Sequence, residues 1–134
     1  MRCSNWETLL AEYLDKCLNK PFVWGEHDCC LFAANVIKII TGVDFAAPFR
    51  GKYSTQLGAI RALKRYGSGD LTSTLNMIFG EPVSTLNVRR GDVALVANSG
   101  EPAMAIVFNG LWYVGVNGLV KTTMTDALVF WRVD

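Results

Sequence analysis

The hydrophobic pattern of the chain changes its period once, near Pro82, and this change constrains the fold more than any other feature. Before Pro82 the apolar residues recur at the three- and four-residue spacing of helices. After it, short apolar runs alternate with turn residues, and Asn-Gly pairs at 109–110 and 117–118 separate neighbouring runs. Asn-Gly between apolar runs is the strongest short-range signal of a β-hairpin. We therefore predict one α+β domain over residues 1–134, helical over about 4–80 and antiparallel sheet over about 88–134.

Each helical run begins at a polar residue and ends at a glycine or proline, as capped helices do. The second run, which Asp28 is placed to cap, is apolar nearly all round, so we expect it to be the central buried helix. The helices are expected to pack on one face of a curved β-meander. The expected helices span about residues 6–17, 29–41, 55–66 and 70–79, and the expected strands span about 93–96, 103–108, 111–116, 119–123 and 128–133.

The composition excludes several classes of protein. With 134 residues, of which 51% are hydrophobic and 19% charged, the chain is long enough for one domain and too apolar to be disordered. Its longest nearly apolar run, residues 29–40, is shorter than the roughly 18 residues that a membrane span needs. The net charge of +1 gives no general argument for nucleic-acid binding. The first residues lack the apolar stretch of a signal peptide, so we expect a soluble protein made in a cytoplasm.

Cysteine and histidine usage argues against a metal site. The four cysteines are Cys3, Cys17, Cys29 and Cys30, and the single histidine is His27. A structural zinc site needs a second pair of such ligands, and none is present to complete one. Vicinal cysteines cannot form an ordinary disulfide. We therefore expect no metal and no cofactor.

Cys29 is the one thiol whose predicted position favours chemistry. With Asp28 as the helix cap, its sulfur lies in the first turn of a helix, near unpaired backbone N–H groups and the positive end of the helix dipole. Such a position stabilises a thiolate and is typical of nucleophilic cysteines. A structural thiol that happens to begin a helix fits this pattern equally well.

Three short motifs stand at informative places: Trp24-Gly25, Asp28-Cys29 and, as a turn before a strand, Gly91-Asp92 followed by Val93. Together they resemble the NlpC-type branch of papain-like cysteine peptidases. The run at 24–32, with residues 130–133, is more closely similar to a small family encoded among the tail genes of long-tailed phages and prophages. The resemblance extends over most of the chain and implies a papain-like fold, with helices on an antiparallel β-meander or half-barrel.

Enzymes of the NlpC type cut peptide bonds in bacterial cell walls. They use a cysteine, a histidine at the start of the second strand and a third polar residue on the next strand, and a tyrosine ahead of the Trp-Gly pair helps to build the oxyanion site. In this sequence Ala103 or a neighbour stands at the histidine position, Val114 or Gly115 at the third position, and Phe22 at the tyrosine position. Because losing the base of a triad costs on the order of a thousandfold or more in rate, the resemblance implies a catalytically degenerate domain.

His27 is the only imidazole that could replace the missing base. It precedes Cys29 by two residues, so their α-carbons should lie within about 7 Å of each other. A neighbour in the same turn does not easily sit across a cleft from the sulfur, and a helix N-terminus disfavours the imidazolium form. We therefore treat Cys29 and His27 as vestigial or weak catalytic candidates, with Asp28 as the helix cap.

Three functions remain open at this point. The first is a structural or assembly component of a bacteriophage tail, at the tail tip or baseplate hub, made in the host cytoplasm and carried in the virion. Its partners would be other tail proteins (hub, distal tail or tip proteins) in a hetero-oligomeric assembly, without nucleic acid or a membrane span. The second is an active cysteine hydrolase that cuts cell-wall peptides during phage entry, with Cys29 as nucleophile and His27 as base. The third is a small intracellular binding module.

Overall fold

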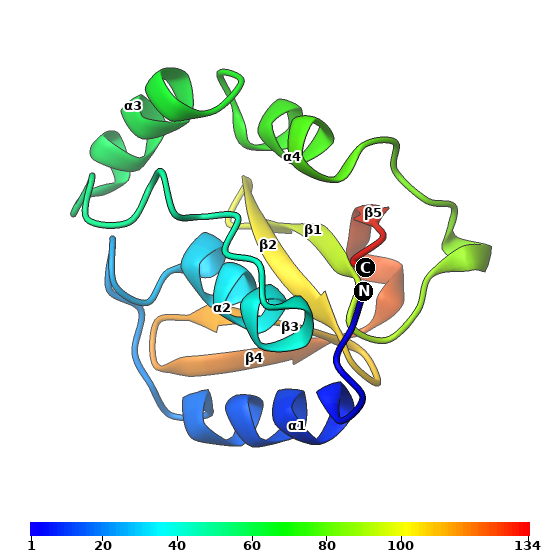
Figure 1. The fold of residues 1–134 in the computed structure, drawn as a ribbon. Helices are drawn as coiled ribbons and strands as arrows, with labels where there is room; N and C mark the ends of the chain where they lie inside the picture. The colour runs from blue at the N-terminus through cyan, green and yellow to red at the C-terminus, as the bar shows by residue number, and fades with distance from the viewer.

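The computed structural model describes residues 1–134 and shows four α-helices and a five-stranded antiparallel sheet (Figure 1). This confirms the α+β class and the change from helix to strand near Pro82. Short 3-10 turns occupy Thr85–Asn87 and Met124–Asp126. The helices are α1 (Trp6–Cys17), α2 (Cys29–Thr41), α3 (Gln56–Tyr66) and α4 (Leu71–Phe79), and the strands are β1 (Val93–Asn98), β2 (Glu101–Val107), β3 (Leu111–Gly115), β4 (Gly118–Thr122) and β5 (Ala127–Trp131).

Local side-chain chemistry places the helix ends close to where the sequence predicts them. Asp28, Thr55 and Asp70 each accept a hydrogen bond from the backbone N–H three residues later, at 2.9, 3.0 and 2.7 Å. Gly42 ends α2 in the left-handed conformation, with a φ of 82°. Asn5 precedes α1, but its side chain makes no capping hydrogen bond.

The strand order differs from a continuous meander. The sheet runs β4-β3-β2-β1-β5, so β1 to β4 form the predicted meander while β5 returns to pair with β1. In this position Trp131 of β5 is fully buried, and its indole N–H donates to the Asn76 side chain of α4 at 3.0 Å. The prediction of a meander is therefore wrong for β5, because burial of this large side chain against α4 requires the opposite edge of the sheet.

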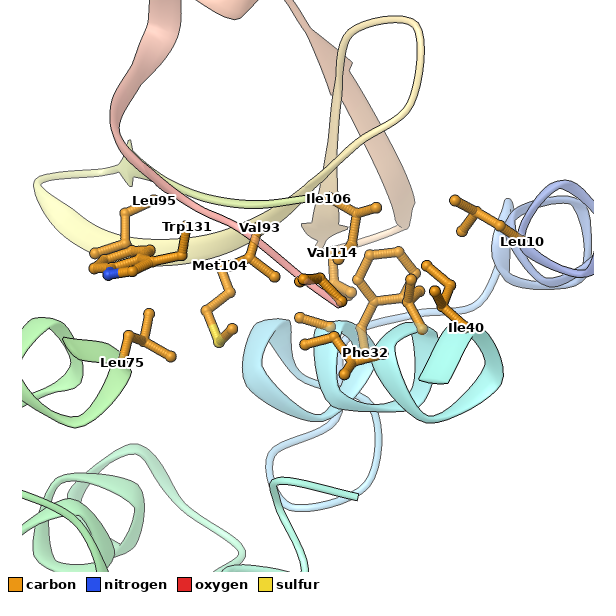
Figure 2. Close-up of a cluster of buried hydrophobic side chains, with 14 of the residues drawn as sticks. Leu10, Phe32, Ile40, Leu75, Val93, Leu95, Met104, Ile106, Val114 and Trp131 are labelled. Carbon is orange, nitrogen blue, oxygen red and sulfur yellow. The ribbon is translucent and has the colours of Figure 1, made fainter. Parts of the chain in front are cut away.

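The main core lies between α2 and one face of the sheet (Figure 2). Phe32 and Ile40 of α2 pack in one cluster with Ile106 of β2 and Val114 of β3. α1 and α4 add leucines to the same cluster, so the helices cover this face as predicted. The residues of α2 that are buried are Leu31, Phe32, Ala33, Ala34, Val36, Ile37 and Ile40, which confirms it as the central buried helix.

The other face of the sheet buries a second, smaller cluster. It contains small side chains of β1 and β2, among them Ala94, Ala103 and Ala105. Val83 and Val88, from the segment that leads into the sheet, pack against this cluster. Both faces of β1 and β2 are therefore covered by side chains. None of the four helices is both long and apolar enough to cross a lipid bilayer.

A buried carboxylate ties the two ends of the chain to the sheet. Asp92, which directly precedes β1, is fully buried and accepts hydrogen bonds from the guanidinium groups of Arg2 at 2.9 Å and Arg132 at 3.3 Å. Its oxygens also accept from the backbone N–H groups of Arg89 at 2.9 Å and Val133 at 3.1 Å. Asp92 therefore fixes the start of the sheet, the N-terminal segment and the C-terminal segment at one point.

Candidate functional site

The site around Cys29 is built on the first turn of α2. Asp28, which is 1% exposed, caps this turn through Leu31, and its second oxygen accepts from the backbone N–H of Gly25 at 3.0 Å. The same oxygen accepts a 2.6 Å hydrogen bond from the hydroxyl of Tyr53, in the loop before α3. Asp28 therefore has the capping role that the sequence predicts, and it also holds the Trp24-Gly25 turn and the loop before α3 against the helix.

The sulfur of Cys29 lies in an environment that favours its thiolate. The Sγ atoms of Cys29 and Cys30 are 3.8 Å apart, within hydrogen-bond reach. This hydrogen bond lowers the pKa of Cys29, with backbone hydrogen bonds at Met104 and Cys30 acting in the same direction, while burial and the Asp28 carboxylate oppose the shift. The pKa of Cys30 is raised well above its ordinary value, by the same contact with Cys29 and by its own burial.

These opposite shifts predict selective alkylation of the two thiols. The thiolate is the reactive form, so Cys29 is expected to react with iodoacetamide at a lower pH than an ordinary cysteine, and Cys30 only at a higher pH. Peptide mapping after brief labelling at several pH values measures this. Equal labelling of both thiols at every pH would contradict the assignment of Cys29 as the thiolate. The Cys30→Ala variant should shift the profile of Cys29 towards higher pH, because it removes the hydrogen bond.

Met104 is the residue of β2 that faces the thiol. Met104 belongs to the cluster on the α2 side of the sheet and lines a cavity together with Cys29, whereas Ala103 lies in the cluster on the other face. The β2 side chain that shares the cavity wall with the Cys29 thiol is therefore a thioether. Val114 is buried in the apolar core on the same face as Met104, and Phe22 packs edge-to-face on Trp24 with ring centroids 4.8 Å apart. None of these side chains can act as a base.

His27 is buried but does not pair with Cys29. The side chain is 1% exposed, and neither Nδ1 nor Nε2 makes a hydrogen bond. Its ring packs edge-to-face against Phe32, with centroids 6.1 Å apart, and its backbone forms an isolated bridge with Val23. The only side-chain partner of the Cys29 sulfur is Cys30. The structure thus brings Cys29 and Asp28 together as predicted, and no hydrogen bond joins the Cys29 sulfur to the imidazole of His27.

The unpaired imidazole of His27 predicts a pH-dependent stability. Burial, aided by the positive charge of Lys20, lowers the pKa of His27 below 6.5 in the folded protein. The unfolded chain then binds more protons, so the free energy of unfolding should fall as the pH drops below about 6.5 towards the folded pKa. His27 is the only histidine, and His27→Leu should therefore flatten the dependence between pH 7 and 5 and leave stability at pH 7 unchanged or higher. Urea unfolding at a series of pH values tests this, and a decline of equal steepness in the variant would contradict it.

An apolar cavity of about 80 Å³ lies beside Cys29, between α2 and the two helices α3 and α4. Of its 19 lining residues, 17 are hydrophobic. Tyr53 is part of this wall, and no sequence signal points to it because it comes from a loop that lies 25 positions after Asp28. No group of three His, Cys, Asp or Glu side chains is placed to hold a metal ion. The remaining lining residues include Trp24, Phe45, Phe49, Leu63, Leu75, Phe79 and Met104.

Comparison with known protein families gives a match over nearly the whole chain. A family model described as a domain of unknown function, DUF6950, matches residues 1–133. No curated protein matches the chain.

Proposed function

The chain belongs to the DUF6950 family, and we propose that it is a catalytically degenerate papain-like domain of the NlpC type that serves as an assembly component of a bacteriophage tail. The observation that carries the non-catalytic role is the environment of Cys29. Its sulfur contacts a second thiol and lies beside a cavity walled by the Met104 side chain, where a peptidase needs an imidazole. The resemblance of the sequence to tail-operon proteins supplies the assembly role, at the tail tip or baseplate hub.

The missing base argues against efficient amide hydrolysis for a specific reason. A cysteine peptidase needs a proton donor for the leaving amine and a base for the attacking water, and one imidazole supplies both. The two nitrogens of His27 are buried and unpaired, so they reach neither the sulfur nor the cavity. The lowered pKa of Cys29 gives a nucleophile without the group that completes turnover.

The surface of the domain offers apolar side chains that an assembly would bury. Leu86 is 95% exposed, Val116 79% and Leu128 66%. Leu128 lies on β5 and Val120, 37% exposed, on β4, which are the two edge strands of the sheet. Apolar side chains exposed on edge strands favour burial against another chain. We propose that the partners are other tail proteins such as hub, distal tail or tip proteins.

Two measurements test this function. Mass spectrometry of purified phage particles should detect the chain in the virion, and its absence from particles would exclude the tail role in favour of an intracellular binding module. Incubation of the purified protein with peptidoglycan should release no peptide fragments above the level of the Cys29→Ala variant. Release that Cys29→Ala abolishes would overturn the non-catalytic role and support the active hydrolase.

A further inference from the structure

The cavity beside Cys29 is walled almost entirely by hydrophobic residues. Its only two lining residues outside the hydrophobic set are Asp28 and Thr74. The Asp28 carboxylate already accepts from two backbone N–H groups and the Tyr53 hydroxyl. The Thr74 hydroxyl donates to a backbone carbonyl at 2.6 Å and accepts from a backbone N–H at 3.0 Å. Because a polar group buried without a partner is costly, the occupant that fits this cavity is uncharged and apolar.

The volume of the cavity limits the occupant to a small group. An apolar cavity of about 150 Å³ stays dry and binds benzene. The space beside Cys29 is about 80 Å³, so by the same measure it has room for a chain on the order of four carbon atoms. Both Cys29 and Cys30 form part of the wall, so a group that enters the cavity lies next to a thiol.

The site lacks what amide cleavage needs and retains what thioester exchange needs. An amide requires a proton on its leaving nitrogen, whereas a thioester releases a thiolate, which leaves without a proton donor. The contact that favours the Cys29 thiolate is the Cys30 thiol, whose Sγ lies 3.8 Å from that of Cys29. A nucleophile without a neighbouring base can therefore accept an acyl group from a thioester, and the same absence leaves no base to activate water for its removal.

We propose that Cys29 is an S-acylation site, at which the cavity receives the short apolar chain of an acyl thioester. The Cys29 thiolate attacks the carbonyl carbon and a new carbon–sulfur bond forms. The carbon–sulfur bond of the donor breaks, and the donor leaves as a thiolate that takes up the proton lost by Cys29. No oxidant or reductant takes part. The acyl chain then fills the space between α2, α3 and α4 and remains bound to Cys29.

The test compares two acyl donors of similar length that differ in charge, butyryl and succinyl thioesters of N-acetylcysteamine. Intact-mass spectrometry and peptide mapping should show one butyryl group on Cys29 and none in Cys29→Ser. The succinyl donor should react at least about tenfold more slowly, because its carboxylate would have to enter an apolar cavity. Equal rates for the two donors, or acylation spread over Cys3 and Cys17, would overturn the proposal.

A cavity-filling variant tests whether the preference for the butyryl donor comes from the cavity or from the thiol alone. Ala59 of α3 lines the cavity, and Ala59→Leu should abolish the preference for butyryl while iodoacetamide still labels Cys29. Ala11→Leu, at an exposed position of α1, is the matched control and should keep the preference.

The outcomes also distinguish this proposal from the proposed tail function. Failure to acylate refutes only the acylation site, whereas release of more than one equivalent of donor thiol together with free butyrate would overturn both retention of the acyl group and the non-catalytic role.

Discussion

Replacing Asp92 with alanine is expected to lower the free energy of unfolding by about 3–5 kcal/mol. The carboxylate is fully buried and accepts four hydrogen bonds, two from guanidinium groups and two from backbone N–H groups. Its removal takes away the salt-bridge partner of Arg2 and Arg132, whose side chains are only 13% and 24% exposed. It also leaves the backbone N–H of Val133 unpaired in a buried position. Urea unfolding followed by circular dichroism measures the loss as a lower midpoint at constant slope.

Glu7→Ala provides the matched control for this loss. Glu7 pairs with Arg90 at 2.5 Å, but the two side chains are 46% and 53% exposed. An exposed ion pair of this kind contributes at most about 1 kcal/mol. If Asp92→Ala lowers the free energy of unfolding by no more than Glu7→Ala does, the Asp92 carboxylate does not hold the ends of the chain to the sheet in the way that its contacts indicate.

The helices and most strands could be predicted because their signals are local. A capping side chain, an apolar period and a glycine in the left-handed region act within a few residues of the chain, as Asp28, the run of α2 and Gly42 show. The first four strands follow from turn residues between apolar runs. Such features depend on backbone hydrogen bonding and side-chain spacing, which the sequence states directly.

The parts that sequence reasoning missed depend on contacts between distant segments. From the sequence Asp92 is a turn residue before a strand, and only the fold brings Arg2, Arg132 and Val133 around it. The hydroxyl of Tyr53 reaches Asp28 from a loop that carries no motif. The pairing of β5 with β1 depends on where the Trp131 side chain finds a buried partner. None of these contacts leaves a periodic or compositional signal.

The register of β2 decides which of two adjacent residues lies on the same side of the sheet as Cys29, and the sequence alone leaves this open. Alternate residues of a strand point to opposite faces of a sheet, so a difference of one position changes the face. Ala103 and Met104 are adjacent, yet only Met104 lies on the α2 side and shares the cavity wall with Cys29. The resemblance noted in the sequence implies only Ala103 or a neighbour, and the pairing of Met104 with Leu95 in the sheet shows which face each of the two residues takes.

Met104→His is expected to increase the reactivity of Cys29 by about a hundredfold at pH 6, because it would place an imidazole in the cavity wall that also contains Cys29. A His–Cys pair lowers the pKa of the thiol by several units in cysteine peptidases. The rate of iodoacetamide labelling of Cys29 as a function of pH measures the change, as a shift of the curve towards lower pH. The variant should also release peptides from peptidoglycan at a low rate, because the third residue that orients the imidazole is still absent.

Ala103→His is the matched control, because it introduces the same side chain one position away, on the opposite face of the sheet. Both positions are nearly buried, at 4% for Met104 and 5% for Ala103, so each histidine costs stability for a similar reason. The labelling curve of Cys29 should remain at its original pH in Ala103→His and move only in Met104→His. A shift in both variants would mean that the added charge acts through general electrostatics. No shift in either would mean that a side chain at position 104 does not reach the sulfur, and the thioether of Met104 would then not support the proposed non-catalytic role.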